Sequence, residues 1–136
     1  MVELKLDEAR VDRLDEVLAF LDGQLEAAEC PMKLQMQLDV AMEEIYVNIA
    51  SYAYAPGTGP ATIRVSALED GHTVEITFVD AGMPFNPLEK DDPDVTLSAE
   101  ERQIGGLGIY MVKKTMDEVI YAREDGKNVL TLRKRI

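Results

Sequence analysis

The sequence predicts a two-layer α/β sandwich of the α+β class, with about three helices on one face of a mixed, mostly antiparallel sheet of about five strands. Two long segments carry apolar residues at helical spacing, and shorter segments alternate apolar and polar residues as half-buried strands do. Two Asp-Gly turns indicate antiparallel hairpins. The chain has 136 residues, of which 46% are hydrophobic, so it is long enough for one domain with a single core.

The N-terminal half predicts one strand and two helices. Residues 2–6 alternate as a strand, and Asp7 is a plausible N-cap for an amphipathic helix over residues 8–29. Pro31 predicts the start of a long central helix over residues 32–54, because the first turn does not need its missing N–H. The apolar stripe of that helix comprises Leu34, Leu38, Met42, Ile45, Ile49 and Ala53. The methionines that we expect to fill the core are Met32, Met36 and Met42.

The C-terminal half predicts two hairpins and a third helix. One hairpin turns at Asp70-Gly71 and the other at Asp125-Gly126. The helix is expected over residues 108–116, and its inward-facing residues are expected to be Leu107, Met111 and Val112. Residues 83–104 have no clear period and carry prolines and an acid-rich run, so they predict a functional lid.

Charge and cysteine content limit the classes of partner and the compartment. The net charge of −12 argues against nucleic acid or an anionic membrane as a partner, since both need a basic surface. ATP stays open, because backbone N–H groups and a local cation can hold an anion. The single Cys30 allows no intramolecular disulfide, and the chain shows neither a signal peptide pattern nor an apolar stretch long enough for a bilayer. We therefore expect a cytoplasmic protein.

The central helix places a carboxylate and a carboxamide on one face. Glu44 and Asn48 are four residues apart, so their side chains point the same way. The Asn48 carbonyl oxygen can serve a Mg²⁺ ion whose other ligands are phosphate oxygens and water. Glu44 can take a proton from an attacking hydroxyl or water. Taken alone, the pair is more simply explained as a solvated polar face.

Two later segments carry groups that suit a nucleotide. Asp80 ends a predicted buried strand and can accept the amine of adenine, while Gly82 permits close backbone approach. An ordinary turn is the simpler alternative. The Gly-Gly-Leu-Gly sequence at residues 105–108 opens a predicted helix, where N–H groups can bind phosphate. It is neither a P-loop, which needs Gly-Lys-Ser/Thr, nor a dinucleotide fingerprint, which needs a third glycine at its own spacing.

The order of these motifs resembles that of the GHKL (Bergerat-fold) ATPases. Glu-Glu-x-x-x-Asn, Asp-x-Gly and Gly-Gly-Leu-Gly follow one another here as in that family, and bacterial anti-sigma-factor serine/threonine kinases are the most similar members. The resemblance covers nearly the whole chain. It implies a single histidine-kinase-like ATPase domain over residues 1–136, the Bergerat ATP-binding fold, ATP and Mg²⁺ as cofactors, and an ATP lid at about 83–104.

The resemblance also implies residue roles. Glu44 matches the general base, and Asn48 matches the Mg²⁺ ligand of the nucleotide site. Asp80 matches the acid that binds the adenine amine, with Gly82 beside it. The residues implied to contact the phosphates are Arg102, Gly105, Gly106, Leu107 and Gly108.

The leading functional hypothesis is an ATP-dependent serine/threonine kinase that acts as an anti-sigma regulator. The resemblance implies that it phosphorylates a serine on an anti-sigma-antagonist (STAS-type) partner, that a sigma factor is a second partner, and that the kinase forms a homodimer. The alternative is a non-catalytic ATP-binding module that sequesters a protein partner. Retention of Glu44 favours the enzyme, since a binder has no use for a base there. Pro84 and Tyr52 depart from the family pattern and leave the identity of the partner open.

Overall fold

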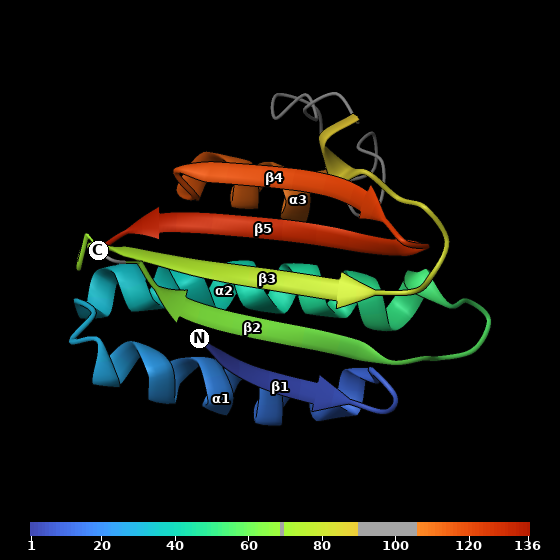
Figure 1. Cartoon of the computed structure of the whole chain (residues 1–136), viewed down its shortest axis with the longest axis horizontal. Helices are drawn as coiled ribbons and strands as arrows, with labels where there is room; N and C mark the ends of the chain where they lie inside the picture. Colours follow the sequence, from blue (N-terminus) through green and yellow to red (C-terminus); the bar gives the residue numbers. More distant parts are fainter. Residues whose placement is uncertain (69, 90–105) are drawn as a thin grey trace.

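The computed structural model describes residues 1–68, 70–89 and 106–136. In this part, five strands form one sheet in the order β1-β2-β3-β5-β4, and all of its pairings are antiparallel. Figure 1 shows the helices on one side of the sheet, with α2 between α1 and α3. The strands are β1 (Val2–Leu6), β2 (Ala61–Ala67), β3 (Thr73–Asp80), β4 (Glu118–Glu124) and β5 (Lys127–Arg135). The helices are α1 (Leu14–Ala27), α2 (Met32–Asn48) and α3 (Gly106–Thr115). The predicted fold class is confirmed.

Both predicted hairpins form, each for a local chemical reason. In the β2–β3 turn, the Asp70 carboxylate accepts the N–H groups of His72 at 2.8 Å and Thr73 at 3.0 Å. In the β4–β5 turn, Asp125 and Gly126 have φ angles of 51° and 75°. Positive φ at both central residues is the conformation whose twist matches that of paired strands.

The core lies between the sheet and the helices, and the placement of the methionines in it was only partly predicted. Met42 is fully buried, but Met32 and Met36 are 67% and 61% exposed. Met36 lies about 200° around the helix from the buried Leu38, which puts it on the outer face. Met111 of α3 is likewise 44% exposed, whereas Val112 is buried as expected.

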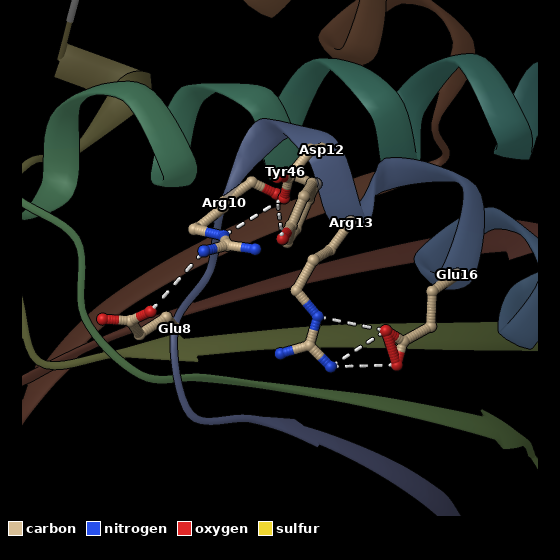
Figure 2. A network of polar contacts seen from close by, with 6 residues as sticks. All are labelled: Glu8, Arg10, Asp12, Arg13, Glu16 and Tyr46. Atoms are coloured by element: carbon tan, nitrogen blue, oxygen red, sulfur yellow. Dashed lines mark hydrogen bonds and ion pairs between the residues drawn. The ribbon is translucent and has the colours of Figure 1, made fainter.

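The first helix begins later than Asp7. A 3-10 turn at Val11–Arg13 precedes α1, and the preceding residues connect distant parts of the fold instead. The N–H of the buried Ala9 donates to the Gly59 carbonyl at 2.8 Å, and the Tyr46 hydroxyl donates to the Arg10 carbonyl at 2.7 Å. Figure 2 shows Tyr46 meeting this segment beside the ion pairs of Arg10 and Arg13. These tertiary hydrogen bonds fix the backbone in a non-helical form.

The central helix keeps its predicted extent but changes form near its end. The α-helix ends at Asn48, and a π-helical turn follows at Ile49–Ala53. The Ala53 carbonyl accepts the Met83 N–H at 2.9 Å, which joins the end of this helix to the segment after β3. Most of the predicted lid, residues 90–104, lies outside the described residues. Among the helices that the structure describes, none has the length and apolarity that a membrane span requires.

Candidate nucleotide-binding site

A cavity of about 360 Å³ lies between the end of the central helix and the sheet. Most of its wall is apolar, and the few polar side chains come from different elements. Asn48 lines it from α2, Asp80 from β3, Tyr121 from β4 and Asn128 from β5, while Ile109 of α3 closes another side. An apolar pocket with a few polar groups from separate elements is typical of a small-molecule site.

Asp80 presents one free acceptor oxygen to this cavity. Its side chain is 6% exposed, and Oδ1 accepts the Gly82 N–H at 2.9 Å and Asn128 Nδ2 at 3.0 Å. Within the described residues, Oδ2 accepts no hydrogen bond. A carboxylate oxygen without a protein donor, on a residue that lines a cavity, is a group that an incoming amine would satisfy. The position therefore suits the predicted contact with adenine.

Gly82 is required by a close backbone approach. A Cβ at this position would overlap with the Ala53 carbonyl oxygen and lie 2.7 Å from the Ala53 Cβ. The Gly82 carbonyl also accepts Arg123 Nη1 at 2.9 Å. These contacts press the chain after β3 against the π-helical turn, and so they set one edge of the cavity.

The structure brings Glu44 to the start of α3. Glu44 is exposed on α2, and a Cβ built on Gly108 would overlap with its Oε2 and lie 2.9 Å from its Cδ. Asn48, one turn further along α2, is half-buried and lines the cavity. Glu44 thus lies at the first turn of α3, and Asn48 lies between it and the cavity that Asp80 also lines. This is the juxtaposition that the sequence motifs predicted.

Gly106 and Leu107 begin α3, and their backbone N–H groups belong to the first turn, which has no intrahelical acceptors. Such a turn can receive phosphate oxygens. Arg102 and Gly105, which were also predicted to contact phosphate, lie outside the described residues. The part of the chain that the structure describes contains no cluster of three or more His, Cys, Asp or Glu side chains for a metal. In the predicted site, the Asn48 carbonyl is one Mg²⁺ ligand, and phosphate oxygens and water supply the others.

Two polar residues of the cavity, Asn128 and Tyr121, and a neighbouring residue, Tyr54, were missed from the sequence. Asn128 lies directly opposite Asp80 in the β3–β5 register, and Tyr121 of β4 donates its hydroxyl to Asn128 Oδ1. Tyr54 accepts the Ala81 N–H at 2.7 Å, and burial raises the pKa of its hydroxyl. Asn128 left a signal: it is in phase with the buried Leu130 and Leu132, so a polar group stands on the inner face of its strand.

Comparison with known proteins identifies one family. The family model of the histidine kinase-like ATPase domain matches residues 8–134. The serine/threonine-protein kinase BtrW of Bordetella bronchiseptica is 31% identical over 100 residues, which is 74% of this chain and 70% of that protein. The serine-protein kinase RsbW of Bacillus mycoides is 31% identical over 97 residues, which is 68% of this chain and 59% of that protein. The match thus covers less than two thirds of the Bacillus relative.

Two solved structures share the fold. A chain in the crystal structure of the SiaB–SiaC complex from Pseudomonas aeruginosa superposes with a TM-score of 0.60 at 19% identity, covering 98% of this chain and 89% of that one. The catalytic domain of the histidine kinase ThkA gives 0.51 at 10% identity, covering 99% and 98%. At these identities the likeness concerns the fold. Because the family model matches all but the ends of the sequence, this chain belongs to the histidine kinase-like (GHKL) ATPase family.

Proposed function

We propose that this protein is an ATP-dependent serine/threonine kinase that regulates transcription by phosphorylating a serine on an anti-sigma-antagonist partner of the STAS type. One observation carries the proposal: the Glu44 carboxylate lies against Gly108 at the start of α3, at one end of a path that leads past Asn48 to Asp80. In this order, a general base (Glu44), a metal ligand (Asn48) and an acid that recognises the nucleobase (Asp80) suit a bound nucleoside triphosphate.

Different residues of the site are expected to bind the nucleobase and the phosphates. The apolar wall excludes water from one end, where the free Oδ2 of Asp80 can accept an amine. The other end lies near the first turn of α3, whose N–H groups and helix dipole favour phosphate. This local field explains how a chain with a net charge of −12 can hold a polyanion.

Phosphoryl transfer at the end of the site near α3 needs few protein groups. ATP supplies the phosphoryl group, and Mg²⁺ offsets its negative charge. Glu44 is exposed, so the hydroxyl of a serine on another protein can reach its carboxylate, which receives the proton of that hydroxyl. Asn48 orients the metal side of the nucleotide one helical turn away.

The choice of partner rests on the relatives. BtrW and RsbW are named as serine/threonine- and serine-protein kinases, and the sequence motifs resemble those of anti-sigma-factor kinases. A sigma factor as a second partner and a homodimer belong to the same proposal.

The test is transfer of labelled phosphate from Mg-ATP to candidate antagonist proteins of the same genome, with Glu44→Gln compared against Glu43→Gln. Both residues are exposed neighbours on α2, but only Glu44 reaches Gly108. We expect Glu44→Gln to slow transfer by about 100-fold or more while ATP still binds, because general-base catalysis contributes roughly that much. Glu43→Gln should transfer at the wild-type rate.

Two outcomes would contradict the kinase. One is the absence of transfer to every candidate by a protein that binds ATP. The other is a Glu44→Gln variant that controls its partner as well as the wild type does. Either result would favour the alternative, a non-catalytic ATP-binding regulatory module that sequesters a protein partner.

A further inference from the structure

We propose that Asn128, oriented by Tyr121, is a positioning residue that sets base preference by deciding which oxygen of Asp80 faces the cavity. The inference rests on the proposed function only in that the cavity receives a purine nucleotide. It needs neither the phosphotransfer step nor any particular protein partner.

The side-chain amide of Asn128 is fully used within the protein. Its Nδ2 donates to Asp80 Oδ1 at 3.0 Å and to the Met83 carbonyl at 2.9 Å. Its Oδ1 accepts the Phe85 N–H at 3.3 Å and the Tyr121 hydroxyl. A carboxamide has two N–H donors and two acceptor positions, and all four are occupied here. Asn128 therefore has no group left for a ligand, although it lines the cavity and is only 7% exposed.

The surroundings allow only one orientation of this amide. Nδ2 faces two acceptors, the Asp80 carboxylate and the Met83 carbonyl, whereas Oδ1 faces two donors. A flipped amide would set oxygen against oxygen on one side and N–H against donors on the other, which leaves buried polar groups unpaired. The Tyr121 hydroxyl strengthens this choice because its donor reaches Oδ1 from β4.

A fixed amide in turn fixes Asp80. Asn128 and the Gly82 N–H both bind Oδ1, so the carboxylate is held by one oxygen and Oδ2 is left for the cavity. An ionised carboxylate oxygen only accepts hydrogen bonds. It therefore favours a purine with an amino group at that point and disfavours one with a carbonyl or a bare C–H, since a buried polar group left unpaired loses binding energy.

The Asn128 amide also links Asp80 to the segment that follows β3. Asn128 lies directly opposite Asp80 in the β3–β5 register. Its hydrogen bonds with Met83 and Phe85 hold the segment after β3 against β5. Loss of the Asn128 amide would therefore have two effects at once. The Asp80 carboxylate could rotate, and the segment of Met83 and Phe85 at the edge of the cavity would lose its contact with β5. The expected effect falls on the base end of the site, far along the path from Glu44.

The experiment measures equilibrium binding of three nucleotides to the full chain: ATP, purine riboside triphosphate, which lacks the amino group, and inosine triphosphate, which carries a carbonyl there. The variants are Asn128→Ala and Tyr121→Phe, which removes only the hydroxyl donor. Leu132→Val is the matched control, because this buried residue lies on the same strand and outside the cavity. A hydrogen bond to a charged group gives a wild-type preference for ATP of about tenfold or more.

We expect Asn128→Ala to reduce this preference by about tenfold and Tyr121→Phe to reduce it by a smaller factor, while Leu132→Val keeps it. A wild type without preference, or variants that weaken all three nucleotides equally, would overturn the proposal. Failure of the wild type to bind any nucleotide would instead overturn the proposed function.

Discussion

Gly82 and Gly108 are both too crowded for a side chain, but different atoms crowd them. A Cβ at Gly82 meets the backbone of Ala53, whereas a Cβ at Gly108 meets the far end of the Glu44 side chain. Backbone cannot move without disturbing the π-helical turn, while a glutamate side chain on the surface can rotate away. Gly82 therefore supports the fold, whereas Gly108 leaves room for the side chain of Glu44, the proposed general base.

This difference predicts that Gly108→Ala keeps the protein folded and impairs transfer. Alanine is favoured over glycine inside a helix by up to about 1 kcal/mol, so the melting temperature should stay level or rise. Displacing Glu44 should reduce phosphotransfer by about 100-fold, since a shift near 1 Å can cost that much. Thermal unfolding and labelled-phosphate transfer measure the two effects.

Two further variants make this comparison decisive. Gly23→Ala in α1 meets nothing within 4 Å, so it should stabilise the protein and leave transfer unchanged. Gly82→Ala should destabilise it, because the overlap there is with the Ala53 backbone. Normal transfer by Gly108→Ala would show that the position of Glu44 in the structure is unrelated to activity.

At the scale of elements, α1 and α2 are joined by a pair of acids. Burial raises the pKa of Asp39 to about 7, and a side-chain hydrogen bond with Asp22 and the negative charge of Asp22 add to this shift. Gln35 Nε2 donates to Asp22 Oδ1 at 3.3 Å across the same contact. Burial also raises the pKa of the Cys30 thiol at the junction of the two helices, and the negative charge of Asp39 adds to this shift. The contact therefore favours a protonated Asp39.

The raised pKa predicts a pH dependence of stability. The folded protein holds a proton on Asp39 that the unfolded chain releases near pH 3.8, so its stabilising contribution is lost as pH rises from about 4 to 7. Asp39→Asn should therefore have a flatter decline of melting temperature over this range than the wild type. The exposed Asp15→Asn, with the same charge change, should keep the wild-type slope. Parallel curves for all three proteins would contradict a raised pKa of Asp39 in the folded protein.

At the scale of the whole molecule, an acidic protein is expected to bind a polyanion through local groups. Its net charge is −12, yet the first turn of α3 and the cavity beside it offer N–H groups and an acceptor for an amine. Net charge governs solubility and long-range attraction, whereas binding depends on the field within a few ångström.

ATP binding should therefore stabilise the folded chain in the presence of Mg²⁺. At a free ATP concentration of 100 times Kd, the free energy of unfolding rises by about 2.7 kcal/mol. For a domain of this size, that corresponds to a melting temperature roughly 10 °C higher. Asp80→Asn should show a smaller shift, because asparagine has a single oxygen, which the two internal donors occupy, and its NH₂ group cannot accept an amine. The absence of any shift at millimolar Mg-ATP would count against a nucleotide site.

Much of the site could be predicted because it depends on local sequence. Glu44 and Asn48 share a helix, so their spacing alone puts them on one face, and the turns at Asp70 and Asp125 follow from residue type. The exposed Met32 escaped prediction, because methionine is apolar in any setting and only packing decides which helix face meets solvent. The partners of Asn128 escaped for a related reason, since they lie 43 to 48 positions away, at Phe85, Met83 and Asp80, or across the β4–β5 hairpin.

By itself, the sequence determined the order and type of the elements and the family motifs, since periodicity and turn chemistry act between near neighbours along the chain. Tertiary structure decided what the motifs face. It brought Glu44 to Gly108, closed a cavity over Asp80, and set Asn128 opposite that acid. These contacts join residues remote in sequence, and they depend on strand register and on which helix face packs against the sheet.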